Sequence, residues 1–393
     1  MEFFKNTHNS LLKSREFSLS RELLKQIDWS QRLICIKGFR GVGKTSFILD
    51  YIKKEYPGNE SVLFLNLNNF YFTKRKIFSF ADEFSKRGGK VLFLDQIQKY
   101  PDWSSELRMC YDQIPDLKIV FTSSPVLRVV DGNNDLQGIT TMYHLEGLSF
   151  REFLNYNSSL NFRVYDLEEI ITNHTQISQE VVARIKPLAY FNQYLQTGYF
   201  PYFMTESSFF NIKLLKNINL ALEIDIPYLN QIELKYLSKL RKLLHIIATQ
   251  TPFTPNVSKL AASVETSRAT IMNYLRYLKN AKLINLLYSN GDDSLDQMKK
   301  PDKIYMHNTN ILYAVAPNNM KNLNLRHTFF FNQVGYQNKV NTSVNADFLV
   351  NNKYEFIVGG KKIKPKGDTY GASDMIEVGR GNKIPLWLFG FLY

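Results

Sequence analysis

The sequence has few of the residues that stabilise extracellular proteins or build metal sites. Only two cysteines occur among its 393 residues, Cys35 and Cys110, and neither has the spacing of a metal or redox motif. The six histidines are scattered singly and form no H-E-x-x-H pattern. Because disulfides are rare in reducing compartments, this scarcity of cysteine predicts a cytoplasmic protein.

Long apolar runs are also missing. The longest, Val91–Leu94 and Ile218–Ile226, are too short or too interrupted to span a bilayer, which takes about 20 apolar residues. Residues 1–12 contain no apolar core of the length found in signal peptides. We therefore expect neither a membrane partner nor secretion.

The charge balance is basic, with a formal net charge of +13. An excess of this size favours contact with polyanions such as nucleic acid or nucleotides. Since no single basic tract dominates the sequence, a solvated basic surface is the open alternative.

The composition changes along the chain and indicates several domains, as the length also does. Residues 1–150 alternate short apolar runs with helical stretches, which predicts an α/β domain with a parallel sheet. The expected strands are 33–37, 61–67, 90–94 and 118–122. Residues 151–250 are mostly helical, residues 251–290 indicate a small helical unit of DNA-binding type, and residues 300–393 return to short strands. The polar stretch 289–300 is the best candidate for a linker.

A phosphate-binding motif carries the clearest chemistry. Residues 38–45 read G-x-x-x-x-G-K-T, directly after the strand 33–37 and at the start of a helix. Glycines let the backbone curl so that its amides and the helix dipole face a phosphate. Lys44 is expected to reach the β- and γ-phosphates, and Thr45 to bind Mg²⁺. We predict ATP and Mg²⁺ as ligands, with contacts from Gly38, Arg40, Gly41, Val42, Gly43, Lys44, Thr45 and Ser46.

Two further strand ends are expected to complete this site. Asp95 follows the apolar run Val91–Leu94 and is predicted to hold Mg²⁺ through water at the carboxyl edge of the sheet. The strand 118–122 ends in Thr122 and Ser123, whose hydroxyls are candidates for sensing the γ-phosphate or the attacking water. The alternative for these hydroxyls is a polar turn.

The motifs together resemble the bacterial AAA-type ATPases, common in gut Bacteroidetes, that carry an ATPase domain followed by a domain called DUF4143. The segments that carry the resemblance are 38–46, 92–103, 145–154, 197–201, 300–305 and 383–393, of which Leu-Ser-Phe-Arg-Glu at 148–152 is the most specific. The resemblance implies an AAA-like domain at 1–150, a helical lid at 151–250, a winged helix at 251–290, and a C-terminal domain at 300–393 similar to PD-(D/E)xK nucleases.

At several positions this chain lacks the residue that the family usually has, and these differences lower the rate of ATP hydrolysis that we expect. The family usually has Glu as general base where this chain has Gln96, and an amide can orient water but cannot take its proton. A pair of family arginines is replaced by Gly138-Ile139, which leaves Arg128 and Arg151 as the nearest candidates for an arginine finger. Asp95 and Gln96 therefore stand as the catalytic pair of an ATPase that hydrolyses slowly or not at all. The open alternative is an active ATPase that uses another carboxylate, Glu106 or Glu146.

The C-terminal domain also lacks residues of the pattern that the resemblance implies, here the acidic residues of a PD-(D/E)xK nuclease. Asp347 and Lys361 match an acidic position and the lysine of the nuclease pattern, but two further acidic positions are Ile357 and His327 here. One carboxylate rarely holds Mg²⁺ by itself, so we expect no nuclease activity.

Residues 255–287 read as a helix, a turn, a second helix and a strand. Ile271, Leu275 and Leu278 are expected to face the core, and Ser267 to cap the second helix. The residues left facing outward are Arg268, Thr270, Asn273 and Arg276, of which Arg268, Asn273 and Arg276 are the candidate nucleic-acid contacts. The alternative is a packing module beside the lid.

The sequence thus predicts an ATP-binding AAA-like protein in which nucleotide sets the orientation of the lid and C-terminal domains. A nucleic-acid-binding regulator is the second possibility, and a homo-oligomer or a protein partner is expected in either case.

Overall fold

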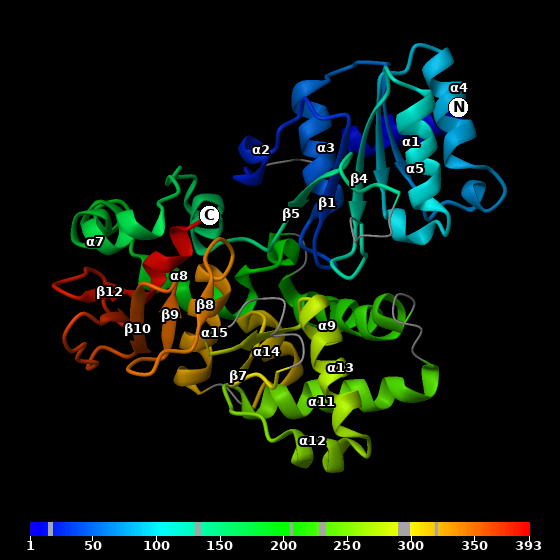
Figure 1. Ribbon diagram of the computed structural model, residues 1–393. Coiled ribbons are helices and arrows are strands. Elements are labelled where there is room, and N and C mark those ends of the chain that lie inside the picture. Colours follow the sequence, from blue (N-terminus) through cyan, green and yellow to red (C-terminus); the bar gives the residue numbers. More distant parts are fainter. Residues whose placement is uncertain (15–18, 130–134, 205–206, 228–232, 290–298, 319–320) are drawn as a thin grey trace. The chain divides into compact units, whose positions relative to one another are not determined.

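The computed structural model describes residues 1–14, 19–129, 135–204, 207–227, 233–289, 299–318 and 321–393 (Figure 1). The chain divides into two compact units, Met1–Glu146 and Gly147–Tyr393. The boundaries predicted at 250 and between 290 and 300 fall inside the second unit and stay predictions. Most of the predicted linker lies outside the described residues.

The first unit is built on a five-stranded parallel sheet with the order β2-β3-β4-β1-β5. The strands are β1 (Leu33–Lys37), β2 (Val62–Asn66), β3 (Val91–Asp95), β4 (Lys118–Ser123) and β5 (Thr141–His144). The four predicted strands and their parallel pairing are confirmed. The fifth, β5, was not predicted because its sequence Thr-Met-Tyr-His has no apolar run and is only partly buried.

Helices connect these strands and cover the sheet (Figure 1). They are α1 (Glu2–Lys13), α2 (Leu23–Gln26), α3 (Lys44–Glu55), α4 (Ile77–Lys86), α5 (Trp103–Gln113) and the short turns η1 (Phe70–Thr73) and η2 (Ile97–Lys99). Helix α1 lies along the edge strand β2, where His8 Nδ1 accepts the backbone N–H of Phe64 at 3.0 Å. Burial lowers the pKa of His8, which keeps the ring neutral and able to accept this bond. An edge amide is thereby satisfied inside the chain.

The second unit combines many helices with two sheets. Its helices are α6 (Phe150–Ser158), α7 (Leu167–Val182), α8 (Pro187–Gln193), η3 (Tyr194–Gly198), η4 (Pro201–Met204), η5 (Ser207–Phe209), α9 (Phe210–Leu220), η6 (Ala221–Asp225), η7 (Leu234–Tyr236), α11 (Leu237–Gln250), α12 (Val257–Val264), α13 (Arg268–Asn280), α14 (Thr309–Val315), α15 (Asn322–Val334) and η8 (Leu386–Phe391). Strands β6 (Ile284–Leu287) and β7 (Lys303–Met306) form an antiparallel pair. The larger sheet has the order β12-β11-β10-β9-β8, with β8 (Val340–Asn341), β9 (Phe348–Val350), β10 (Tyr354–Gly359), β11 (Tyr370–Ser373) and β12 (Lys383–Pro385).

Aromatic side chains form the core between α15 and the larger sheet. The ring of Phe330 packs against Phe348, Phe356 and Phe389 with centroids 4.9–5.2 Å apart. Phe329–Phe331 and the aromatic residues at the chain end are buried in the same core. The apolar run at the end of the chain therefore completes this core.

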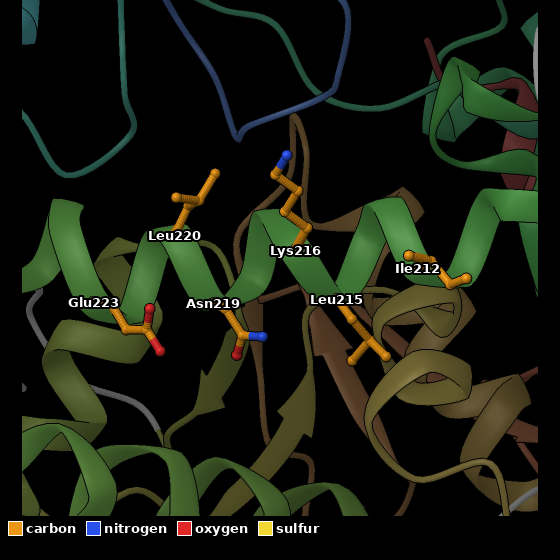
Figure 2. Close-up of a pocket in the computed structure, with 6 residues that line it drawn as sticks. All are labelled: Ile212, Leu215, Lys216, Asn219, Leu220 and Glu223. Carbon is orange, nitrogen blue, oxygen red and sulfur yellow. The ribbon is translucent and has the colours of Figure 1, made fainter.

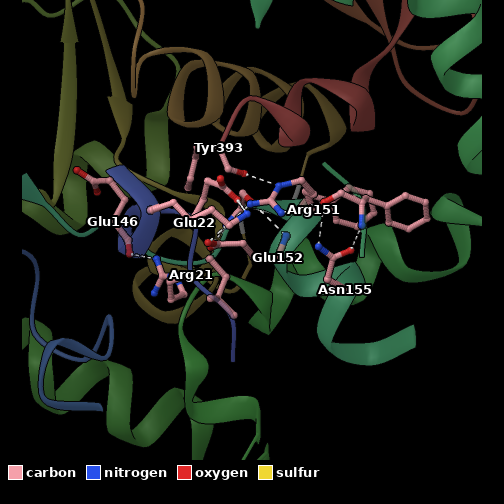
Figure 3. Close-up of polar contacts among 12 residues, drawn as sticks. Arg21, Glu22, Glu146, Arg151, Glu152, Asn155 and Tyr393 are labelled. Carbon is pink, nitrogen blue, oxygen red and sulfur yellow. Dashed lines mark hydrogen bonds and ion pairs between the residues drawn. The ribbon is translucent and has the colours of Figure 1, made fainter. Parts of the chain in front are cut away.

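The Leu-Ser-Phe-Arg-Glu segment organises the start of the second unit. Ser149 and Glu152 form a reciprocal capping box at the beginning of α6. Arg151 is 3% exposed and donates to the backbone carbonyls of Tyr393 and Phe162, each at 3.0 Å (Figure 3). Arg151, a candidate arginine finger, therefore has a structural role, because it binds the carbonyl of Tyr393 at the end of the chain. Arg128, the other candidate, is exposed.

Replacing Arg151 is expected to destabilise the second unit. The change Arg151→Ala removes the guanidinium that donates to the carbonyl of Tyr393 and leaves the carbonyl of Phe162 with Asn155 Nδ2 as its remaining donor, which costs about 2–4 kcal/mol. Differential scanning calorimetry measures the effect as a lower melting temperature. The matched control is Arg163→Ala, because Arg163 pairs with Glu169 in solvent and such pairs contribute about 0–1 kcal/mol. Equal shifts for both variants would contradict the assignment.

Candidate nucleotide-binding site

The phosphate loop spans residues 38–43, between the end of β1 and the start of α3. Gly41 and Gly43 adopt φ angles of 87° and 95°, which residues with a side chain rarely adopt. At Gly38 the constraint is space, because an added Cβ would lie 2.4 Å from the carbonyl oxygen of Leu145. All three glycines of the loop, the motif positions Gly38 and Gly43 and the intervening Gly41, are thus required by its shape.

Neighbouring strands hold this loop in place. The amide of Gly38 donates to the carbonyl of Ser123 at 3.3 Å, and the amide of Leu145 donates to the carbonyl of Lys37 at 2.7 Å. These bonds join the loop to the ends of β4 and β5. The loop is therefore fixed by the carboxyl edge of the sheet, where ligands of open α/β sheets bind.

A buried arginine outside any motif also contacts the loop. Arg21 is 5% exposed and donates to the carbonyl of Val42 at 3.2 Å and to the carbonyl of Glu146 at 2.7 Å (Figure 3). It links the phosphate loop to the last residue of the first unit. Sequence reasoning missed Arg21 because it precedes the motif by many residues and follows no recognisable pattern.

The ammonium of Lys44 lies inside the curl of the loop. It donates to the carbonyls of Gly38 at 2.6 Å and Phe39 at 3.0 Å. By contrast, the ammonium of Lys37 donates to the carbonyl of Leu127 at 2.7 Å. Lys44 thus binds the backbone of the loop that is expected to receive the phosphates.

Asp95 is the centre of the hydroxyl cluster beside the loop. Its side chain is buried, and its carboxylate accepts from Thr45 at 2.9 Å and from Thr122 at 2.6 Å. Asn66 adds a third donor at 3.4 Å. This convergence follows from the sheet order, since β4 lies between β1 and β3 and Asn66 is opposite Asp95 in the register. The structure brings Thr45, Asp95 and Thr122 together, and Asn66 is the member that sequence reasoning missed.

Gln96 directly follows Asp95 in a left-handed conformation, with φ of 62°. Its backbone N–H donates to the hydroxyl of Thr122 at 2.9 Å. The Thr122 hydroxyl therefore joins β3 to β4 twice, as a donor to Asp95 and as an acceptor from Gln96. A non-glycine residue in this region costs about 1–3 kcal/mol, and these bonds hold it there.

Ser123 points away from this cluster. Successive residues of a strand face opposite sides, so its side chain lies against Cys35, with Oγ 3.5 Å from Sγ. Burial raises the pKa of Cys35 to about 12, which keeps the thiol neutral. The sequence grouped Thr122 and Ser123 as sensors, but the Ser123 side chain is on the other face of β4 and only its carbonyl contacts the phosphate loop.

Glu106, one of the carboxylates considered as an alternative base, binds the start of α4. It is 2% exposed, accepts the amide of Phe78 at 2.9 Å and lies 3.6 Å from the ammonium of Lys76. A carboxylate at the start of α4 is favoured by the helix dipole. Glu106 is thereby occupied in capping a helix.

The candidate residues of the C-terminal region are only partly brought together. His327 Nε2 lies 3.4 Å from the Asp347 carboxylate, which also accepts the amide of Val358 at 2.9 Å. The pKa of Asp347 is lowered overall. Burial alone would raise this pKa, but the interactions of the carboxylate with His327 and with the Val358 amide outweigh the effect of burial. Lys361 is exposed on the following loop. In the described ranges, no three His, Cys, Asp or Glu side chains gather as a metal site.

Helices α12 and α13 follow the predicted pattern. Ile271, Leu275 and Leu278 are buried, and the Ser267 hydroxyl accepts the amide of Thr270 at 3.0 Å. Of the candidate nucleic-acid contacts, Arg268 is exposed, whereas Arg276 donates to the side chain of Asn273. The two helices and the β6–β7 pair have the predicted order of elements, and the winged helix stays a prediction.

A pocket lies along α9 and η6 in the second unit (Figure 2). It is lined by Ile212, Leu215, Lys216, Asn219, Leu220 and Glu223. Asn219 and Glu223 both accept from Arg241 of α11, so these two polar groups of the pocket are engaged within the protein. All lining residues come from one helical stretch and do not converge on a common point, which makes this a weaker ligand site than the phosphate loop.

Comparison with known proteins supports the interpretation of the first unit. Residues 30–154 match the family described as "AAA domain". The match begins just before β1 and includes the phosphate loop, Asp95 and Thr122. Across the part of the chain that the structure describes, no helix has the length and apolar character needed to span a bilayer.

The second unit matches a different family from the expected one. Residues 188–322 match a domain of unknown function, DUF8612. The predicted DUF4143 assignment is wrong, because the family that matches this region is DUF8612. The matched range runs from α8 into α15 and crosses the predicted boundaries at 250 and 290.

The curated relatives are archaeal and do not support the expected bacterial origin. Two uncharacterized proteins of Methanocaldococcus jannaschii are 23% and 24% identical over 290 and 274 residues. These alignments cover 70% and 64% of this chain but only 60% and 55% of the relatives. The chain therefore spans little more than half the length of each relative.

Solved structures give a weak likeness. AMPPCP-bound DnaA from Aquifex aeolicus has a TM-score of 0.24 at 13% identity, covering 66% of this chain and 86% of that chain. A DNA polymerase III gamma subunit-related protein from Thermotoga maritima has a TM-score of 0.26 at 11% identity, covering 66% and 99%. TM-scores this low establish no shared arrangement, so the site is interpreted from its own residues.

Removing the Thr122 hydroxyl is expected to weaken the first unit. The change Thr122→Val leaves the Gln96 amide without an acceptor and takes one donor from Asp95, which costs about 2–4 kcal/mol in unfolding free energy. Urea denaturation measures this loss. Thr122→Ser restores the hydroxyl and is expected to recover most of the stability. Equal destabilisation by both changes would show that the methyl group matters and the hydroxyl does not.

Proposed function

We propose that this chain binds Mg-ATP at the loop 38–45 and hydrolyses it slowly. The observation that carries the proposal is the convergence of Lys44, Thr45 and Asp95 at one sheet edge. Magnesium is usually bound through one or two carboxylates together with substrate phosphates and water, and the Asp95 carboxylate with the Thr45 hydroxyl fits that donor set. When bound, the ion supplies charge neutralisation to the phosphates.

Slow turnover follows from the residue after Asp95. An amide at Gln96 can position water by hydrogen bonds, but it has no basic group to accept a proton at neutral pH. Among the carboxylates considered as substitutes, Glu106 is engaged at the start of α4. The proposal is therefore a nucleotide-binding protein that has Lys44, Thr45 and Asp95 for binding but Gln96 at the position expected for the general base.

A regulatory role for nucleotide is supported by the contacts of the phosphate loop. Arg21 joins the carbonyl of Val42 to that of Glu146, and Gly38 lies directly against the carbonyl of Leu145. A nucleotide that changes the loop would therefore alter the residues immediately before the second unit. We propose that this segment communicates the nucleotide state to residues 147–393.

Removing the Lys44 ammonium tests the binding site. Hydrogen bonds to charged groups contribute about 1.5–3 kcal/mol, so Lys44→Ala is expected to weaken ATP binding roughly tenfold to hundredfold. Isothermal titration calorimetry with Mg²⁺ present measures the change. The control is Lys86→Ala, because Lys86 is exposed on α4 and pairs with Asp82. Unchanged affinity in Lys44→Ala, or no binding by the unaltered protein, would overturn the proposal.

Restoring a carboxylate tests the slow-hydrolysis proposal. A general base contributes about 10²–10⁴ in rate, so Gln96→Glu is expected to raise phosphate release at least about a hundredfold. A coupled phosphate-release assay measures the rate, and the double change Lys44→Ala with Gln96→Glu is expected to abolish the gain. A fast unaltered protein that Gln96→Glu does not accelerate would instead favour another base.

A further inference from the structure

The connection between β10 and β11 carries four lysines within six residues. Its sequence after Gly360 is Lys-Lys-Ile-Lys-Pro-Lys, and all four lysines are exposed. We name residues 361–366 the lysine strap. Sequence analysis found no dominant basic tract because the tract is short and interrupted by Ile363 and Pro365.

The apolar residues of the strap are turned inward. An added Cβ on Gly359 would lie 2.4 Å from the side chain of Ile363, and one on Gly371 would lie 2.7 Å from the side chain of Pro365. Ile363 and Pro365 therefore pack against the backbone of Gly359 in β10 and Gly371 in β11, where a side chain is absent. Lys362, Lys364 and Lys366 alternate with these two residues and face solvent.

Hydrogen bonds fix the ends of the strap. The amide of Ile363 donates to the carbonyl of Gly360 at 3.1 Å, and the amide of Lys366 donates to the hydroxyl of Thr369 at 2.9 Å. Lys383 Nζ donates to the carbonyl of Lys361 at 3.4 Å. The lysines therefore project from an ordered backbone, so less conformational entropy is lost when they bind a partner.

The strap lysines have no acidic partner among the described residues. By contrast, Lys5, Lys25, Lys86 and Lys235 each pair with a carboxylate. Within the described ranges, no carboxylate lies within 4.0 Å of a strap ammonium, although the exposed Asp368 follows two residues later. Four adjacent positive charges repel one another, and a polyanion relieves that repulsion.

We propose that the lysine strap binds the phosphate backbone of nucleic acid. Lysines act as point charges toward successive phosphates, and such contacts carry affinity without reading the sequence. A lipid surface fits less well, because the apolar residues of the strap are packed on the sheet and cannot insert. A protein partner also fits less well, since lysine is depleted at protein interfaces. This inference is independent of the proposed ATP site.

Fluorescence anisotropy with a labelled duplex and a labelled single strand, at several salt concentrations, tests the proposal on the full-length chain. Changing Lys361, Lys362, Lys364 and Lys366 to Gln is expected to reduce the slope of log affinity against log salt by roughly 3–4 for duplex, since each phosphate contact contributes about 0.9. The same four positions changed to Arg are expected to retain binding. Sequence-scrambled duplexes are expected to bind equally.

The matched control removes the same total charge from Lys5, Lys25, Lys86 and Lys235 and is expected to bind as the unaltered protein does. An equal loss in this control would mean that net charge alone attracts the nucleic acid and would overturn the proposal. Loss confined to Arg268→Ala would place the interface on α13 instead. Strap-dependent binding to anionic lipid vesicles without binding to nucleic acid would also overturn it, as would no binding at low salt.

Discussion

The structure of the candidate site depends on the hydrogen bonds of one buried carboxylate. Asp95 is 1% exposed and accepts from hydroxyls of α3 and β4 and from an amide of β2. A buried charge is unfavourable unless such donors surround it, so these three elements are held where their donors reach Asp95. Under the proposed function the same carboxylate, together with the Thr45 hydroxyl, would hold Mg²⁺. Folding and metal binding would then use the same atoms.

The phosphate loop is shaped by the surrounding protein as much as by its own glycines. Gly38 leaves room for the Leu145 carbonyl, and Arg21 ties Val42 to Glu146. A loop held from both sides is preorganised for a phosphate, which lowers the entropy lost on binding. These contacts also connect the loop with the segment that leads out of the first unit, and this supports a role for nucleotide beyond catalysis.

In the second unit, buried polar side chains form hydrogen bonds with backbone groups that lack regular partners. Asn310 accepts the amide of Tyr199 and donates to the carbonyls of Tyr194 and Leu195, which lie in the wide helical turn η3. Such turns leave backbone groups without regular partners, and Asn310 satisfies them. Arg151 does the same for the end of the chain. The Leu-Ser-Phe-Arg-Glu segment thus has a structural explanation, because Ser149 and Glu152 cap α6 and Arg151 binds the carbonyl of Tyr393.

Local sequence patterns were enough to predict the phosphate loop, four of the five parallel strands, Asp95 at the end of β3, and the core face of α13. Each depends on a short pattern of side chains or on backbone geometry that glycine permits. Which groups meet across the chain depends on the folded structure. It added Asn66 and Arg21 to the site, separated Ser123 from Thr122, assigned Glu106 and Arg151 to structural tasks and aligned the strap lysines. Such contacts join residues far apart in sequence. They depend on the order of the strands and on packing, and local residue spacing does not reveal these two properties.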